Sequence, residues 1–220
     1  MNWGEQRAQA RRLLDDTTVG KYRWNDTQLL DYVGWALNAL CAHTALATAS
    51  SFTAEDGLTS FSVPSNAMES VNLSGMIYLK RGTKLIYANP VKYNVATRMG
   101  TSSLSFYLMP ERTVNFNLPL QVGDEVNLFY FAYYPHPTQD SDEILSPDWS
   151  VAAVNYLIAS HAFSPQGGRS AQIRQWGQKP DTGNPEDNSL QNQSQWYLTM
   201  ANHELARWPR QDRRNYFRTG

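Results

Sequence analysis

The spacing of hydrophobic residues changes twice along the chain, and this constrains the fold more than any other feature of the sequence. In residues 26–48 the apolar side chains recur every three or four positions, which predicts a helix with one buried face. In residues 51–134 they alternate with a period of two, and glycine or proline interrupts the pattern about every ten residues. The helical spacing returns after Pro137. The sequence therefore predicts an α+β protein in which a β region interrupts a helical one.

The helical part is expected to form a four-helix bundle-like domain, because each helix has a single wide apolar face. The expected helices are residues 5–14, 26–48, 148–163 and 190–207. Asn25 is suited to cap the second helix, with Gln28 in the reciprocal position of a capping box. Pro147 and Asp148 favour the start of the third helix, and Pro209 ends the fourth.

The β region is expected to be inserted between the second and third helices. Strands are expected at residues 58–63, 71–79, 83–88, 91–97, 104–109, 112–118 and 125–133. The clearest pair is a hairpin joined across residues 81–83. Short strands at this spacing are typical of an antiparallel sandwich or barrel. The predicted domains are a helical bundle domain (residues 1–50 and 138–208), an inserted antiparallel β domain (51–137) and a C-terminal docking arm (209–220).

Composition excludes several classes of protein. The single cysteine, Cys41, cannot form an internal disulfide, so the fold is expected to hold by packing alone. The chain has 19 basic and 20 acidic residues, and a net charge of -1 makes nonspecific binding to nucleic acid or an anionic membrane a poor hypothesis. Residues 1–16 lack the apolar run of a signal peptide, and polar residues interrupt the apolar stretch 33–49. We therefore expect a protein of a reducing compartment without a membrane partner.

No common catalytic or metal-binding motif is present in the sequence. The histidines are His43, His136, His161 and His203, and no two of them have the spacing of a zinc-ligand pair. Ser74 lacks the flanking glycines of a nucleophile elbow. A phosphate-binding loop and a dinucleotide fingerprint are also absent. We therefore predict no catalytic residue, no metal site and no cofactor.

The segment that leads into the third expected helix is acidic. Residues 140–164 contain four acids and no lysine or arginine, which favours either a calcium site or a solvated loop that complements the dipole of the next helix. The loop interpretation is favoured, because the glycine and terminal glutamate of a calcium loop are missing.

Residues 164–189 are polar and are expected to form an extended or mobile arm with at most a short helix at 169–176.

The end of the chain is basic and aromatic. Residues 206–220 hold five arginines and one acid. A frayed tail, a nucleic-acid contact and an arm that docks on an acidic protein surface are the alternatives. Arginine and aromatic residues are enriched in protein interfaces, which favours the docking arm. The candidate docking residues are Arg207, Trp208, Arg210, Arg213, Arg214, Tyr216, Phe217 and Arg218.

Several motifs resemble those of a known family. The leucine pair at residues 13–14 and the arginine–tryptophan turn at residues 22–26 resemble the amino-terminal helices of tailed-bacteriophage head-to-tail adaptor (connector) proteins, including the tail tubular adaptor type. Tyr134-Pro-His-Pro137 and the helix start at residues 147–149 resemble the junction where the family's β insert returns to the helices. The order of helices, β insert and final helix also fits this family.

This resemblance implies a structural neck protein of the virion. Its copies would form a ring, dodecameric in that family, which extends the DNA channel under the portal and provides the docking surface for the tail. The implied partners are the portal protein, a tail or nozzle protein and further copies, while genomic DNA passes without sequence-specific binding. Assembly would take place in the host cytoplasm. Candidate residues of the interface between subunits are Asp140, Asp142, Glu143, Arg169, Arg174 and Trp176.

Two alternatives remain open from the residues. A β-sandwich that displays Tyr78, Tyr87, Tyr93 and Tyr107 would suit a ligand- or carbohydrate-binding module of a phage tail or host-surface protein. Aromatic alternation in strands is more often core packing, which favours the adaptor over this module. A hydrolase would need Ser74 or a histidine beside the acidic loop, and no such pair has a recognisable spacing.

Overall fold

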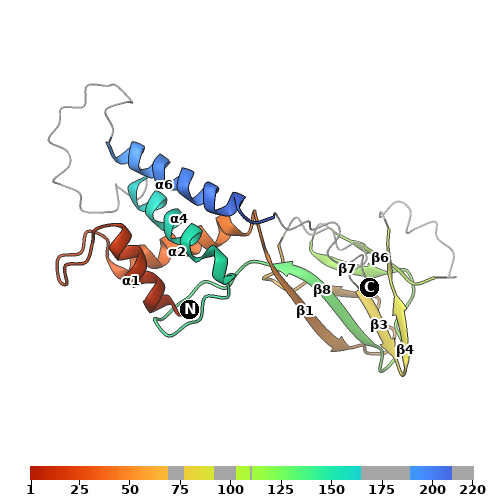
Figure 1. The fold of residues 1–220 in the computed structure, drawn as a ribbon. Helices are drawn as coiled ribbons and strands as arrows, with labels where there is room; N and C mark the ends of the chain where they lie inside the picture. Colours follow the sequence, from red (N-terminus) through yellow and green to blue (C-terminus); the bar gives the residue numbers. More distant parts are fainter. Residues whose placement is uncertain (69–76, 92–102, 110, 165–188, 210–220) are drawn as a thin grey trace. The chain divides into compact units, whose positions relative to one another are not determined.

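The computed structural model describes residues 1–68, 77–91, 103–109, 111–164 and 189–209 (Figure 1). It divides into two compact units. We call residues 1–45 with 134–209 the helical unit, and residues 46–133 the β unit. The protein is α+β, as predicted. Among the residues expected to form elements, 71–76, 92–97 and 169–176 lie outside the described residues.

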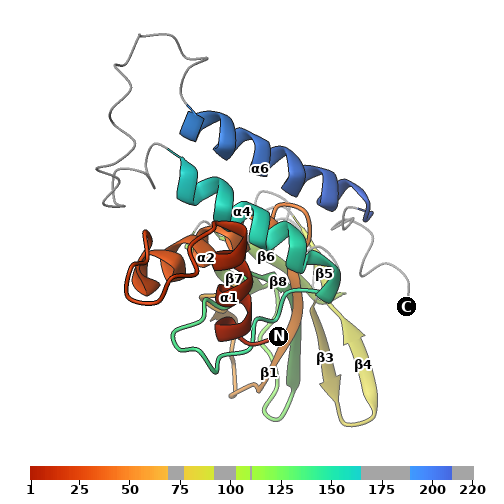
Figure 2. The same cartoon turned by 60° about the vertical axis from the view of Figure 1, so that its left-hand side comes forward.

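The helical unit is built around α4 (Val151–Phe163). Its other helices are α1 (Trp3–Leu13), α2 (Asp26–Leu40) and α6 (Ser189–Ala206). α4 packs against all three, with α6 along one side and α1 and α2 along the other (Figure 2). A short 3-10 helix, η1 (Asp148–Ser150), precedes α4, so the predicted start at residue 148 is helical but not α-helical. Only Ala152 of α4 is exposed, which explains why this helix is apolar on nearly every face.

The starts of α1 and α2 follow from their sequences. Asn25 and Gln28 form the predicted capping box. The Asn25 side chain accepts a hydrogen bond from the Gln28 N–H at 2.8 Å, and the Gln28 side chain accepts one from the Asn25 N–H at 2.9 Å. Asn2 and Glu5 form an equivalent box at α1, which the sequence reasoning missed. Each box satisfies two backbone N–H groups that would otherwise lack partners at a helix start.

The predicted helix 26–48 is wrong in its last third. α2 ends at Leu40, and residues 46–53 form strand β1 (Leu46–Thr53). The alanines at 45, 47 and 49 favour a helix locally, but all eight residues of β1 pair with β8 (Glu125–Ala132). Side-chain burial alternates along β1, which is the period of a strand. Tertiary pairing therefore overrides the local preference for helix.

The β unit contains two four-stranded sheets. The first has the order β1-β8-β3-β4, with β3 (Ile77–Arg81) and β4 (Lys84–Tyr87). The second has the order β2-β7-β6-β5, with β2 (Ser60–Ser62), β7 (Thr113–Phe116), β6 (Ser105–Leu108) and β5 (Asn89–Pro90). Every described pairing is antiparallel except β5 with β6. The predicted hairpin is confirmed as β3–β4, with Gly82 at a φ of +58° in its turn.

One hydrophobic core serves the β unit. Ile77 and Leu128 of the first sheet belong to the same buried cluster as Phe106 and Val114 of the second.

At the end of the hairpin, Arg81 makes two hydrogen bonds to Asp124, at 2.7 and 2.6 Å. These bonds lower the pKa of the Asp124 carboxyl, so that the carboxylate stays ionised where its side chain is almost fully covered.

Candidate functional site

The predicted docking arm begins inside the helical unit. Arg207 and Trp208 lie within the described residues, whereas the other predicted docking residues lie outside them, namely Arg210, Arg213, Arg214, Tyr216, Phe217 and Arg218. Arg207 contacts both carboxylate oxygens of Glu204 at 3.0 Å. The Arg207 side chain is 62% exposed and the pair joins residues three positions apart, so its contribution to stability is small.

Trp208 is held by an aromatic cluster that we call the tryptophan anchor (His43, Trp149 and Trp208). The Trp208 ring stacks on that of Trp149, with centroids 5.3 Å apart and planes 25° apart. The ring of His43 meets Trp149 edge-on at 6.0 Å, and its Nε2 lies 3.2 Å from the Trp208 carbonyl oxygen. The anchor joins the segment after α2, η1 and the end of α6. It therefore fixes the point at which the arm leaves the helical unit.

We predict that Trp208→Ala lowers the free energy of unfolding of the helical unit by about 1–2 kcal/mol. The loss is smaller than for a core tryptophan, because 43% of Trp208 is exposed. Urea unfolding followed by circular dichroism measures the change. Leu198→Ala is the matched control, since Leu198 lies on α6, the helix that leads to Trp208, and is 40% exposed but belongs to no described aromatic cluster. Equal effects of the two substitutions would contradict the anchor.

The acidic loop is built into the helical unit. Asp140 forms an ion pair with Arg7 of α1 at 2.5 Å. The carbonyl oxygens of Asp140 and Asp142 accept hydrogen bonds from Gly4 and Trp3, the first residues of α1, at 3.0 and 2.9 Å. Glu143 is exposed, and its backbone forms an isolated antiparallel β-bridge with that of Asn2. Because these contacts are internal, the role of Asp140, Asp142 and Glu143 between subunits stays a prediction, and Arg169, Arg174 and Trp176 lie outside the described residues.

Asp142 organises the turn that presents this loop. Its Oδ2 accepts hydrogen bonds from the Thr138 N–H at 2.6 Å, the Thr138 hydroxyl at 2.9 Å and the Gln139 N–H at 3.1 Å. These three bonds to the ionised form lower the pKa of the Asp142 carboxyl to about 2. The carboxylate is therefore a structural acceptor that keeps its charge at any physiological pH.

This pKa gives a pH-dependent prediction. An unfolded aspartate has a pKa of about 3.9, so the stabilisation by Asp142 is complete above that pH and is lost as the pH falls toward 2. We expect Asp142→Ala to lower the melting temperature at neutral pH, and the difference from the unsubstituted protein to shrink below pH 4. Glu143→Ala is the control, because its exposed carboxylate makes no hydrogen bond or ion pair with a described residue. A difference that stays constant down to pH 2 would contradict this role.

The sequence reasoning missed a buried charge cluster in the α1–α2 connection. Arg11 is 6% exposed, and its guanidinium contacts Asp16 at 2.7 Å and Asp26 at 2.5 Å. It also donates to the Trp24 carbonyl oxygen at 3.1 Å and lies 3.6 Å from the Tyr22 ring centroid. The signal in the sequence was an arginine beside Ala10 on α1, followed by two acids at residues 15–16 and the arginine–tryptophan turn.

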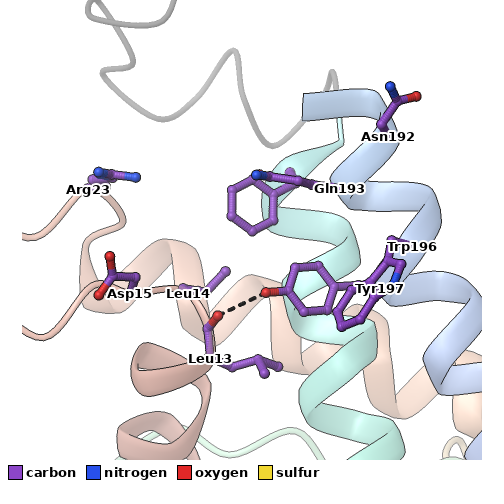
Figure 3. Close-up of a pocket in the computed structure, with 9 residues that line it drawn as sticks. Leu13, Leu14, Asp15, Arg23, Asn192, Gln193, Trp196 and Tyr197 are labelled. Carbon is purple, nitrogen blue, oxygen red and sulfur yellow. Dashed lines mark hydrogen bonds between the residues drawn. The ribbon is translucent and has the colours of Figure 1, made fainter. Parts of the chain in front are cut away.

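A groove of about 640 Å³ opens beside this connection (Figure 3). Figure 3 shows Tyr197 of α6 pointing toward α1, where its hydroxyl donates to the Leu13 carbonyl oxygen at 3.0 Å. The groove is lined by Leu13, Leu14, Asp15, Arg23, Phe163, Asn192, Gln193, Trp196 and Tyr197. These side chains provide no serine, cysteine or histidine nucleophile.

The residues of the alternative hypotheses are dispersed. His161 stacks on Trp35 with centroids 4.6 Å apart, and burial lowers its pKa, so the ring is a neutral packing group. Within the described ranges, no three His, Cys, Asp or Glu side chains form a group that could hold a metal ion. The ring centroids of Tyr78 and Tyr87 lie 6.0 Å apart on the first sheet, whereas Tyr107 is on the second sheet. The other two candidates, Tyr93 and Ser74, lie outside the described residues.

Together, these observations describe an α+β protein with charged and aromatic clusters in its helical unit. A protein-family model described as SU10 adaptor protein matches residues 1–219. The chain belongs to the SU10 adaptor protein family, which confirms the resemblance and supports a structural role as a phage adaptor in the virion neck, with portal and tail proteins as partners. No curated protein matches the chain. None of the described helices is both long and apolar enough to span a membrane.

Proposed function

We propose that this chain is a head-to-tail adaptor whose copies form a ring under the portal, extend the DNA channel and provide the docking surface for the tail. The observation that carries this proposal is the family match over residues 1–219. A ring subunit needs lateral contacts to its neighbours and axial contacts to two different partners. The chain offers separate surfaces for these contacts in the helical unit, the β unit and the arm.

The two units suit a modular subunit. We infer a helical bundle domain that carries an inserted β-sandwich, because α4 packs on three helices and both sheets share one core. We place the boundaries of these proposed domains after Ala45 and Tyr133, where the two compact units divide, in place of residues 50 and 137. The difference arises because β1 already begins at Leu46. We propose that the inserted domain contacts the tail or neighbouring copies.

The arm is proposed to dock on the portal. Residues 210–220 carry four arginines, one acid and two aromatic side chains, and they continue directly from the tryptophan anchor. Arginine pairs with carboxylates through a rigid fork and packs on apolar surfaces, so such a segment fits an acidic, partly apolar surface. A fixed starting point reduces the entropy that the arm loses on docking.

The near-neutral net charge also suits this role. A ring of strongly basic subunits would bind the genome during its passage, because each neutralised phosphate adds to affinity. With a net charge of -1 per chain, genomic DNA is expected to pass without sequence-specific binding. We place the assembled ring in the virion neck and its assembly in the host cytoplasm, and we assign it neither catalysis nor a cofactor.

A ligand-binding β module is the second candidate function. The exposed Tyr87, 66% accessible beside Tyr78, is the observation that favours it, because carbohydrate sites use exposed aromatic rings. Binding of the full chain to glycans, lost in Tyr87→Ala, would support this function. Family membership favours the adaptor.

Co-sedimentation with isolated portal rings tests the proposed function. The purified chain is expected to sediment with the rings and to remain in the supernatant without them. Rings of an unrelated portal are the control for nonspecific adhesion of the basic arm. A chain that remains in the supernatant at all concentrations would contradict the proposal.

A further inference from the structure

The first sheet of the β unit ends in two strands that have a single neighbour each among the described residues. β1 pairs with β8, and β4 pairs with β3. A terminal strand presents a row of unpaired backbone N–H and C=O groups, to which another strand can add. β1 spans eight residues and contains no charged residue, proline or glycine.

The two sheets differ in how their edges are protected. The second sheet ends in β2 and β5, which are three and two residues long, and β5 contains Pro90. Short edge strands, proline and charge are the usual means of preventing unwanted strand pairing. β4 has a charge at Lys84 alone, and β1 has none. An unprotected edge of this length indicates that another strand covers it in the working assembly.

The side chains at the two edges are complementary in size. β4 presents Leu85 and Tyr87 on the face opposite the core, where they are 55% and 66% exposed. On β1 the exposed residues are Ala47, Ala49, Ser51 and Thr53. Large side chains therefore project at one edge and small ones at the other. Such pairs pack well when two strands lie side by side.

The direction of the strands is also complementary. Each of the three pairings from β1 through β8 and β3 to β4 is antiparallel, so β4 runs opposite to β1. When β4 of one copy lies beside β1 of the next in the same orientation, the antiparallel sheet continues. This contact joins two different edges, and a heterologous contact of this kind generates rings. Pairing of two β1 or two β4 strands would instead stop at two copies.

We propose that neighbouring copies in the ring join their β units edge to edge, with β4 of one copy paired antiparallel to β1 of the next. The inference rests on the proposed ring and identifies one of its lateral contacts. A joint limited to the four residues of β4 is far smaller than the roughly 1,200 Å² that a stable pair of proteins buries. The joint therefore forms only when other contacts hold the copies side by side, and the free chain stays monomeric.

Cysteine cross-linking tests the joint in chains bound to portal rings. Ala49→Cys and Leu85→Cys are combined in one chain and treated with a thiol-reactive cross-linker that has a short flexible spacer. Within one chain, β1 and β4 are three strand spacings of about 4.8 Å apart, so cross-links between copies are favoured by a paired edge. The native Cys41 is buried and does not compete. We expect a ladder of covalent multimers, and each single variant is expected to give none.

The matched control combines Ala49→Cys with Leu108→Cys, a similarly exposed leucine of the second sheet. An equally strong ladder from this pair would overturn the proposal. The mass of the same complexes distinguishes failure of the β4–β1 joint from failure of the proposed ring. If many copies are bound but Ala49→Cys with Leu85→Cys gives no ladder, the ring stands and the joint is wrong. If single copies are bound, the ring itself is wrong.

A charge at the joint provides a second readout. Leu85→Lys is expected to raise the concentration needed for half-maximal filling of portal rings by about tenfold, and adding Ala49→Glu is expected to restore most of this loss. Leu108→Lys is the control and is expected to change filling by less than about twofold. Equal effects of Leu85→Lys and Leu108→Lys, or failure of Ala49→Glu to restore filling, would contradict the joint.

Discussion

Replacing Arg11 with alanine is expected to lower the free energy of unfolding of the helical unit by about 3–5 kcal/mol. The substitution leaves the Asp16 carboxylate, which is 4% exposed, without its guanidinium partner. It also removes the donor to the Trp24 carbonyl oxygen and one contact of Asp26. The cost is large because the buried carboxylate loses its opposite charge and keeps only the backbone N–H groups of Arg23 and Trp24 as described donors.

Tryptophan fluorescence measures this effect selectively. All seven tryptophans of the sequence lie outside residues 46–133, so their signal reports unfolding of the helical unit and not of the β unit. Arg12→Ala is the control, since Arg12 is adjacent in α1 and exposed, and a change within about 0.5 kcal/mol is expected. An effect of Arg11→Ala as small as that of the control would show that the charge cluster does not organise the α1–α2 connection.

Removing residues 210–220 is expected to abolish binding to portal rings while the chain stays folded. The truncation preserves Trp208, because a cut before this residue would also remove the tryptophan anchor and destabilise the helical unit. The physical reason for the loss is that the truncated chain lacks the four arginines and two aromatic side chains that we assign to docking. Co-sedimentation measures binding, and circular dichroism confirms the fold.

Two further variants test what the arm contributes. Replacing the four arginines by lysine preserves charge but removes the guanidinium fork, so a partial loss of binding is expected. Replacing them by glutamate is expected to abolish binding, because the docking surface on the portal is inferred to be acidic. Undiminished binding of the truncated chain would contradict the docking role of the arm.

Sequence periodicity predicted those elements whose residues show it locally. The capping box of Asn25 and Gln28 and the β3–β4 hairpin are local features, and both are confirmed. β1 could not be predicted, because its alanine- and threonine-containing sequence is compatible with a helix until it pairs with β8, far along the chain. Long-range pairing therefore decided an element that was assigned wrongly.

The candidate sites also combine features that are visible in the local sequence with contacts that depend on distant residues. The proposed docking arm is visible in the sequence as an arginine- and aromatic-rich segment, but the contacts of Trp208 depend on Trp149 and His43, which are distant from it in sequence. The acidic loop was visible as a charge run, whereas its attachment to α1 depends on backbone hydrogen bonds to Trp3 and Gly4. A composition-based pattern identifies the type of surface, and the fold determines which of its groups are already engaged.

The number of copies bound to one portal ring shows whether this chain forms the proposed ring. Native mass measurement of the purified chain mixed with portal rings gives this number. We expect a monomeric free chain and a complex that contains a complete ring, dodecameric as the family resemblance implies. A complex with one or a few chains, or free chains that never associate with portal rings, would rule out the proposed ring.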